Sequence, residues 1–363
     1  MKMMQTHRGL LIVLLAGMGL MSGCGDATYS EGERYHLQPY TVLEGTDTIK
    51  VYTLPQEKAK ELDELLINFF GTPFKPQVKC DEAQSEINDL QLTPEKMALG
   101  SKLFLAQCNT CHGKEGNGNG KTAATLNPKP RDYRQGKFKY VSTVHKDDDG
   151  KPDTGKANYP SRADLERTIK AGVPGAGMSS FEQTSPERME ALISYVIHLS
   201  LRGQVEYRLT RSWLEEDEKP SEKDVTKELK DILKRWASDA KASYTPTVPW
   251  EEIEREGVKD NWAKGRELFL TKAGCIDCHG KNGMAKVEEL PNIAAMKDDW
   301  GGPIKPRSFV TDPFRGGSRP IDLFYRIKLG IKPSRMQAID STKFSDADIW
   351  NLVGYIQSLQ EKK

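Results

Sequence analysis

The sequence has almost no net charge and no hydrophobic run long enough to cross a membrane. Its 363 residues carry 53 basic and 52 acidic side chains, which gives a formal net charge of +1 at pH 7. This balance excludes a protein that binds nucleic acid through a generally basic surface. Charged residues make up 29% of the chain, which excludes a protein with many membrane-spanning helices. Glycine (31 residues) and proline (20 residues) are frequent, so we expect domains with many loops.

The main apolar run stands at the N-terminus, after a short basic start. It covers residues 10–21, which is too short to span a bilayer but suits the hydrophobic part of a secretory leader. We therefore predict a lipoprotein-type signal peptide over residues 1–23 and an exported protein. Met21-Ser22-Gly23-Cys24 resembles the lipobox of bacterial lipoproteins. The resemblance implies that Cys24 is lipidated and anchors the chain on the periplasmic side of a membrane, with an unmodified Cys24 as the alternative.

Cysteine is scarce, and four of the six cysteines stand in two short motifs. Six cysteines in an exported protein would fit three disulfides. Instead, the chain contains Cys108-Asn109-Thr110-Cys111-His112 and Cys275-Ile276-Asp277-Cys278-His279. Two residues between the cysteines place both sulfurs on one side of a helical turn, where each sulfur can form a thioether with a haem vinyl group. The histidine that follows can then supply the proximal iron ligand.

A single motif of this kind could also be a coincidence, a zinc site or a redox site. Two copies in the same larger context argue against these alternatives, so we predict two covalently bound haem c groups, each with one iron. Cys80 is left without a partner in the chain. We interpret Cys80 as a buried or unreactive thiol, with an intermolecular or redox role as the alternative.

An internal repeat surrounds the two motifs. In each copy a predicted helix leads into the motif, and in the first copy Leu92-Thr93-Pro94-Glu95 is typical of its start. Each of these helices has a glycine four residues before a phenylalanine, which predicts close crossing by another helix: Gly100 with Phe104, and Gly265 with Phe269. Each copy closes with a second predicted helix that has an apolar face, formed by Leu192, Tyr195, Val196 and Leu199 or by Trp350, Leu352, Tyr355, Ile356 and Leu359.

Further matching positions lie between these two helices. A proline–arginine pair follows each glycine-rich stretch, as Pro130-Arg131 and Pro306-Arg307. Later in each copy a glycine is followed six residues on by a methionine, and these pairs are Gly172 with Met178 and Gly330 with Met336.

This pattern resembles two tandem class I cytochrome c domains, and the stretch around Pro130-Arg131 resembles a subgroup of bacterial dihaem cytochromes. The resemblance covers about residues 92–203 and 257–360. It implies an all-α fold in which two cytochrome c domains are joined by a helical linker. The expected segments are an N-terminal extension (24–91), a first domain (92–203), a charged helical linker (204–256) and a second domain (257–363).

In this family a methionine completes the ligation of the iron, so the resemblance and the repeat make Met178 and Met336 the predicted second ligands of the two irons. Methionines more often pack in cores, as Met97 and Met189 do in this interpretation. Met178 differs because Gly175-Ala176-Gly177-Met178-Ser179 is too rich in glycine for a core helix. The competing candidates for the ligand are the histidines His36, His145 and His198.

The resemblance implies two further roles. A proline carbonyl after each motif is expected to accept a hydrogen bond from the ligand histidine, and the candidates are Pro128 or Pro130 and Pro291. Arg131 and Arg307 are expected to bind haem propionates, with ordinary surface arginines as the alternative.

Two flanking segments have helical patterns. Residues 57–70 predict a short helix in the N-terminal extension, with Leu62, Leu65, Leu66 and Phe69 on one face. Residues 215–241 predict a charged helix with an apolar stripe of Leu229, Ile232, Leu233 and Trp236. This stripe indicates either a connector docked on one domain or a surface for a partner protein.

The predicted ligands favour electron transfer. An iron held by protein atoms on both sides can change oxidation state but has no open position for a substrate. We therefore expect a dihaem cytochrome that transfers electrons between periplasmic redox proteins or to a membrane oxidoreductase complex. A dihaem peroxidase-type enzyme with one openable haem is the alternative, although the sequence has no convincing distal acid–base residues. A structural subunit with vestigial haems is disfavoured because both complete ligand sets are present.

Overall fold

The computed structural model describes residues 27–45, 48–146, 158–255 and 258–360. The predicted leader and Cys24 lie outside the described residues, so their roles stay predictions. Within the described part the chain forms twelve α-helices and one two-stranded hairpin. The expected helical fold is therefore confirmed, with the hairpin as an addition that the sequence patterns did not indicate. No helix in the described part is long and apolar enough to cross a membrane.

The N-terminal extension forms the hairpin and two helices. Strands β1 (Tyr40–Glu44) and β2 (Thr48–Tyr52) pair antiparallel, with Tyr40 opposite Tyr52. Helix α1 (Gln56–Phe70) confirms the helix predicted over residues 57–70, and Gly71 ends it at a φ of 65°. Helix α2 (Gln84–Asp89) follows. Short 3₁₀ helices occur along the whole chain, at Asp81–Ala83, Ala123–Thr125, Tyr133–Gln135, Val287–Glu289, Pro291–Ile293 and Lys332–Ser334.

The first half continues with five helices. They are α3 (Pro94–Gln107), α4 (Asn109–His112), α5 (Arg162–Ala171), α6 (Pro186–Glu216) and α7 (Glu222–Lys241). Helix α3 starts as predicted, because the Thr93 side chain accepts a hydrogen bond from the backbone of Lys96 and Pro94 stands in the first turn.

Helix α6 extends past the expected end of the first domain. It runs for 31 residues, so the boundary predicted at residue 203 falls inside a continuous helix. Its inner residues pack on two sides: Leu192, Tyr195, Val196 and Leu199 share a cluster with Phe104, whereas Ile193, Ile197 and Leu201 share another with residues of α1 and α7. The extension and the linker therefore complete the core of the first domain.

The charged segment after α6 is a docked connector. All four residues of its apolar stripe, Leu229, Ile232, Leu233 and Trp236, are at most 1% exposed. They belong to the same apolar cluster as Leu62 and Leu66 of α1. The stripe is therefore not available as a surface for a partner protein.

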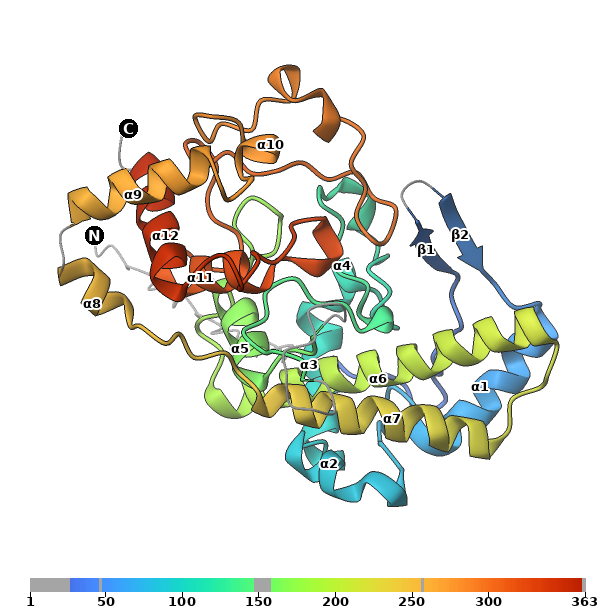
Figure 1. Cartoon of the computed structure of the whole chain (residues 1–363). Helices are drawn as coiled ribbons and strands as arrows, with labels where there is room; N and C mark the ends of the chain where they lie inside the picture. Colours follow the sequence, from blue (N-terminus) through green and yellow to red (C-terminus); the bar gives the residue numbers. More distant parts are fainter. Residues whose placement is uncertain (1–26, 46–47, 147–157, 256–257, 361–363) are drawn as a thin grey trace, which may run out of the picture.

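The second half repeats the arrangement with α8 (Trp250–Arg255), α9 (Val258–Leu270), α10 (Ile276–His279), α11 (Pro320–Leu329) and α12 (Asp346–Gln360). Helix α9 crosses α12 as α3 crosses α6 (Figure 1). A Cβ atom on Gly100 would lie 2.0 Å from the carbonyl oxygen of Ala191, and one on Gly265 would lie 1.9 Å from that of Asn351. The predicted close crossings at these two glycines are thus confirmed.

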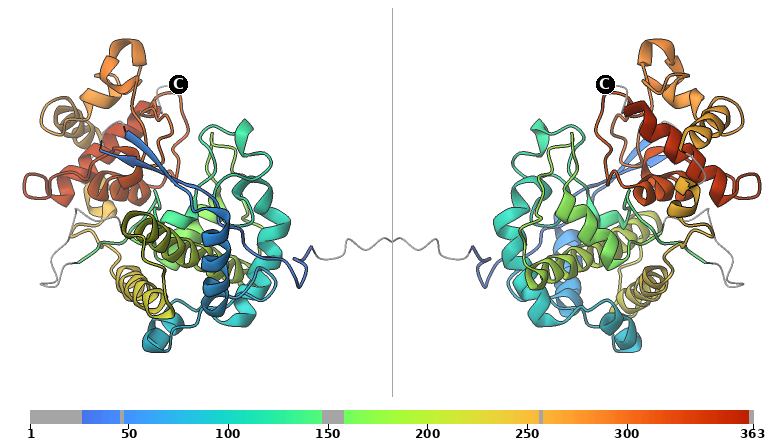
Figure 2. Two further views of the ribbon diagram at one scale, coloured as in Figure 1. Left: turned by 90° about the vertical axis from the view of Figure 1, so that its right-hand side faces the viewer. Right: turned by 90° about the vertical axis from the view of Figure 1, so that its left-hand side faces the viewer.

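The hairpin reaches from the first half to the second. In Figure 2 it projects out of the first half and lies alongside the second half. The backbone N–H of Leu43 donates to the carbonyl of Asp299 at 3.1 Å, and the Arg335 side chain donates to the carbonyl of Gly45 at 3.4 Å. The N-terminal extension therefore holds the two halves together in addition to completing the first core.

Candidate haem sites

Each cysteine motif forms one turn of helix, as its spacing predicted. The backbone N–H of His112 donates to the carbonyl of Cys108 at 2.9 Å, and that of His279 donates to Cys275 at the same distance. Glycines at positive φ, Gly113 and Gly280, end both turns. In each motif the second cysteine and the histidine lie in the short helix α4 or α10, and the first cysteine is the N-cap residue of that helix.

Both histidine rings are oriented by a backbone carbonyl. Nδ1 of His112 lies 3.2 Å from the carbonyl oxygen of Arg131, and Nδ1 of His279 lies 3.1 Å from that of Arg307. Because a carbonyl only accepts, Nδ1 is the protonated nitrogen and Nε2 is unprotonated. Desolvation lowers the pKa of each histidine to about 4, so both rings are neutral at pH 7. Neutral imidazole with an unprotonated Nε2 is the form that binds iron.

The acceptor of this hydrogen bond corrects the prediction from the sequence. We expected the carbonyl of Pro128 or Pro130 to accept this bond in the first copy and that of Pro291 in the second. The acceptor in each copy is instead the carbonyl of the arginine in the Pro–Arg pair. The Pro130 carbonyl lies against Gly118, where an added Cβ would be 2.5 Å away. The Pro291 carbonyl accepts instead from the N–H of Ala294 at 3.2 Å within a 3₁₀ helix.

An aromatic ring stacks on each ligand histidine, which the sequence reasoning did not anticipate. Tyr133 lies on His112 with ring centres 4.8 Å apart, and Phe309 lies on His279 at 4.2 Å. Both aromatic residues stand two positions after the arginine of the Pro–Arg pair, so a comparison of the two repeats could have predicted an aromatic residue at this place. The copies differ because the Tyr133 hydroxyl lies 3.2 Å from Nε2 of His112, whereas Phe309 has no hydroxyl.

The first predicted methionine ligand ends a tight loop. Gly172 starts the loop at a φ of 66°, and the N–H of Val173 donates to the carbonyl of Met178 at 3.0 Å. A Cβ on Gly177, the residue before Met178, would lie 2.7 Å from the side chain of Leu126, in the segment that follows the first motif. The loop of Met178 thus packs on its own haem-motif segment.

The second methionine loop has the same backbone. Gly330 starts it at a φ of 70°, and the N–H of Ile331 donates to the carbonyl of Met336 at 2.8 Å. Arg335 takes the place of Gly177 and also has a positive φ, of 70°. Its side chain donates to the carbonyl of Lys297 at 3.0 Å. Ligation of iron by Met178 and Met336 stays a prediction.

The competing histidines have other partners. His198 is completely buried on α6, and its Nε2 lies 3.2 Å from the Tyr35 hydroxyl. Nδ1 of His145 lies 2.7 Å from the carboxylate of Asp239 on α7. His36 contacts Glu115 through its backbone N–H, at 3.1 Å.

The five described cysteines form no disulfide with one another. Burial raises the pKa of Cys108 to about 12 and that of Cys275 to about 11, which keeps both thiols protonated at pH 7. Cys80 is only 3% exposed in the core of the first half, and burial raises its pKa too. These thiols are therefore not activated as nucleophiles. Among the residues that the structure describes, no three His, Cys, Asp or Glu side chains gather into a metal site.

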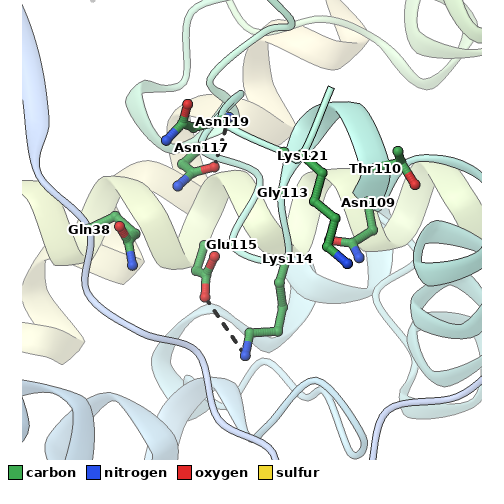
Figure 3. A pocket seen from close by; sticks show the side chains of 10 residues that line it. Gln38, Asn109, Thr110, Gly113, Lys114, Glu115, Asn117, Asn119 and Lys121 are labelled. Atoms are coloured by element: carbon green, nitrogen blue, oxygen red, sulfur yellow. Dashed lines mark hydrogen bonds and ion pairs between the residues drawn. The ribbon is translucent and has the colours of Figure 1, made fainter. Parts of the chain in front are cut away.

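A polar hollow of about 300 Å³ borders the first motif (Figure 3). Its lining includes Asn109 and Thr110, which stand between the two cysteines, and the oppositely charged Lys114 and Glu115. A Lys114–Glu115 ion pair of 4.0 Å crosses this lining. The hollow is too polar for a flat apolar ring, so it lies beside the haem site and is not the haem site.

The residues fit haem c in both copies. Each copy offers two cysteines on one turn, a neutral histidine with an unprotonated Nε2, and an aromatic ring against that histidine. Two buried donors, Nε1 of Trp300 and Nε of Arg315, have no hydrogen-bond partner among the described residues. Unpaired buried donors are rare in proteins and fit a site for an anionic group such as a haem carboxylate.

Comparisons with known proteins identify the family of both halves of the chain. The family model described as cytochrome c matches residues 97–200 and 262–360. A solved structure from Kuenenia stuttgartiensis, titled reducing HAO-like protein complex Kustc0457/Kustc0458, contains a chain with 24% identity and a TM-score of 0.52. The match covers 75% of this chain and 98% of that chain, and it supports the fold alone. A search of curated proteins gives no significant match. Because the family model matches more than half of the sequence, in two tandem segments, the chain belongs to the cytochrome c family.

Proposed function

We propose that the protein is an electron carrier with two covalently bound haem c groups, one in each cytochrome c domain. His112 with Met178 and His279 with Met336 are the proposed ligand pairs. The observation that carries the proposal is that the same site geometry occurs twice. In both copies a carbonyl fixes the ring of the histidine, and a glycine-started loop with one backbone hydrogen bond presents the methionine.

Bound haem supplies an iron that alternates between the ferrous and ferric states. The residues of the chain limit the structural change that accompanies this change in oxidation state. The carbonyls of Arg131 and Arg307 hold the histidine rings, and the Val173–Met178 and Ile331–Met336 pairings hold the methionine loops. A site whose ligands are fixed before and after electron transfer needs little reorganisation, which suits a carrier.

The partners belong to the same proposal. Cytochrome c domains exchange electrons with other redox proteins, and the structural neighbour comes from a protein complex. We infer redox proteins or a membrane oxidoreductase as donor and acceptor. Export and lipid attachment at Cys24 are supported by the leader-like residues 1–23. Replacing Cys24 by alanine should then move the mature protein from the membrane fraction to the soluble fraction.

The ligand pairs can be tested by absorption spectroscopy of the full chain. We expect two haems per chain and a methionine–iron charge-transfer band at the red end of the visible spectrum. Met178→Leu and Met336→Leu should each remove about half of this band, because each substitution removes one sulfur ligand.

Met97→Leu is the matched control, since Met97 is completely buried in the core and its replacement should leave the band intact. A high-spin haem in the unmodified protein would contradict the proposal and favour a peroxidase-type enzyme with one openable haem.

A further inference from the structure

The two Pro–Arg arginines each connect one cytochrome domain to the other. The carbonyl of Arg131 holds His112 in the first domain, while its guanidinium lies 3.9 Å from the ring centre of Trp300 in the second. Conversely, the carbonyl of Arg307 holds His279 in the second domain. Its guanidinium lies beside the first methionine loop, where a Cβ on Gly175 would be 3.5 Å from it. The two haem sites therefore meet at one interface.

More cations surround this interface, centred on Tyr140 of the first domain. A Cβ on Gly316 would lie 2.4 Å from the Tyr140 ring, so the two domains are in close contact there. Burial raises the pKa of Tyr140, and the positive charges of four neighbouring arginines oppose this rise: Arg131, Arg307, Arg315 and Arg326. We call these four arginines, together with Lys139, the interdomain cation cluster.

The cluster is held in place by the backbone. Arg315 donates to the carbonyl of Gly175 in the first methionine loop. Arg326 donates to the carbonyls of Arg315 and Gly317, and so fixes the loop that carries Arg315. These bonds place positive charge between the domains without using a carboxylate.

Among the described residues, carboxylates form only two ion pairs with the five cations of the cluster. Asp312 lies 3.3 Å from Arg307, and Asp298 lies 3.8 Å from Lys139. The charges of Asp132, Asp299 and Asp322 also act on Arg131, Lys139 and Arg326, but without forming an ion pair with them. Burial lowers the pKa of Lys139 to about 8 and that of Arg326 to about 10, so at both groups desolvation outweighs the carboxylates that oppose it. The unpaired Nε of Arg315 and Nε1 of Trp300 lie in the same region. Partly buried cations with unpaired buried donor atoms are stabilised by an anion.

We propose that the interdomain cation cluster binds carboxylates of both haems, so that the two irons share one electrostatic environment. This inference rests on the proposed function, and it goes beyond Arg131 and Arg307 to include Lys139, Arg315 and Arg326. Propionates are the carboxylates that a bound haem carries, so they are the anions that we propose for this junction. Guanidinium groups suit them because they form paired hydrogen bonds with a carboxylate.

The test measures the reduction potentials of both haems by spectroelectrochemical titration of the full chain carrying two haems. Ferric iron has one more positive charge than ferrous iron, so loss of a nearby cation favours the ferric state. Arg315→Gln should therefore lower both potentials. The expected shift is up to about tenfold in each reduction equilibrium, where tenfold is about 59 mV for one electron.

The control variants distinguish an effect of charge on the potentials from an effect on folding. Arg315→Lys keeps the charge and should restore most of the shift, while Lys139→Gln removes a cation from the other domain and should also lower both potentials. Lys219→Gln removes an exposed charge at the turn between α6 and α7 and should change neither potential. Haem content, measured in each variant, should stay at two per chain.

Two results would overturn the inference. If Arg315→Gln and Lys139→Gln, with both haems bound, shift one potential or none, the cluster does not serve both haems. If the potentials of the unmodified protein depend on sulfate concentration in a saturable way, at constant ionic strength, a free anion fills the cluster instead of the propionates. Neither result would affect the proposed ligand pairs, whereas fewer than two haems per chain would contradict the proposed function itself.

Discussion

At the scale of the residue, His198 shows how burial changes the chemistry of a side chain. The ring is completely buried on α6, and its Nε2 lies 3.2 Å from the hydroxyl of Tyr35. That hydroxyl lies 3.0 Å from the hydroxyl of Tyr195. Burial lowers the pKa of His198 from 6.5 to about 3, with the positive charge of Arg202 as a smaller cause. His198 is therefore a neutral member of a buried polar group.

This pKa predicts a loss of stability in acid. Above pH 6.5 the ring is neutral in both the folded and the unfolded chain, so folding is not penalised. As the pH falls below 6.5 the unfolded chain takes up a proton that the folded chain excludes down to about pH 3. At pH 4.5 this difference should reduce the free energy of unfolding by about 2–3 kcal/mol.

Denaturant unfolding of the haem-loaded protein at pH 7 and pH 4.5 measures this effect. The variant His198→Gln has no proton to take up, so it should lose about 2–3 kcal/mol less than the unmodified protein between these pH values. An equal loss in both proteins would show that His198 is not responsible for the acid sensitivity.

At the scale of the element, each pair of crossing helices depends on one glycine. Gly265 of α9 is closest to the backbone of α12, where an added Cβ would meet the Asn351 carbonyl at 1.9 Å. Gly354 of α12 lies near the same crossing, but an added Cβ there would be 3.5 Å from Trp262, an ordinary contact. Both glycines lie within helices, so they differ only in the space that is available for a Cβ atom.

We predict that Gly265→Ala lowers the free energy of unfolding by about 1–3 kcal/mol, because the helices must move apart. Gly354→Ala should be neutral or stabilising by up to about 1 kcal/mol, since alanine is the better helix former. Thermal unfolding of the two variants with haem bound gives the comparison. The interpretation would be wrong if the two substitutions changed the stability equally.

The sequence patterns predicted some elements well and did not predict others. The start of α3 at Thr93-Pro94 and the helix over residues 57–70 were readable because capping residues and apolar spacing act within a few residues along the chain. The hairpin β1–β2 was not, because it depends on contacts with Asp299 and Gly301, about 250 residues away in the sequence. The length of α6 was also missed, since α1 and α7 cover the part beyond residue 203.

At the scale of the whole molecule, the first cytochrome domain is larger than its family pattern. Met97 of α3 and Ile193, Ile197 and Leu201 of α6 are completely buried. They share an apolar cluster with residues of α1 and α7, which lie outside residues 92–203. Burial of each such side chain contributes about 1.5–3 kcal/mol, and a whole domain is stable by only about 5–15 kcal/mol.

A fragment of residues 92–203 should therefore fail to fold, although it contains the complete first motif and Met178. A fragment of residues 27–245 retains the covering helices and should unfold cooperatively. Circular dichroism during thermal unfolding distinguishes the two cases. Cooperative unfolding of the shorter fragment would show that the extension and the linker are dispensable for the first core.

The sequence by itself determined the two haem-binding motifs, the internal repeat, the methionine positions and the helical character of the chain. These features are local, because the spacing of a few residues sets which side chains share one turn of a helix. The sequence did not show that the carbonyls of Arg131 and Arg307 accept the hydrogen bonds of the histidines. We predicted proline carbonyls as the acceptors, and that prediction was wrong.

Only the tertiary structure decided how the two halves meet. The guanidinium of Arg131 lies against Trp300, and Arg315 reaches the carbonyl of Gly175. Each partner is more than a hundred residues away in the sequence, so no spacing along the chain records these contacts. Which cations face one another depends on the packing of two complete domains, because side-chain charges interact through space and not along the chain.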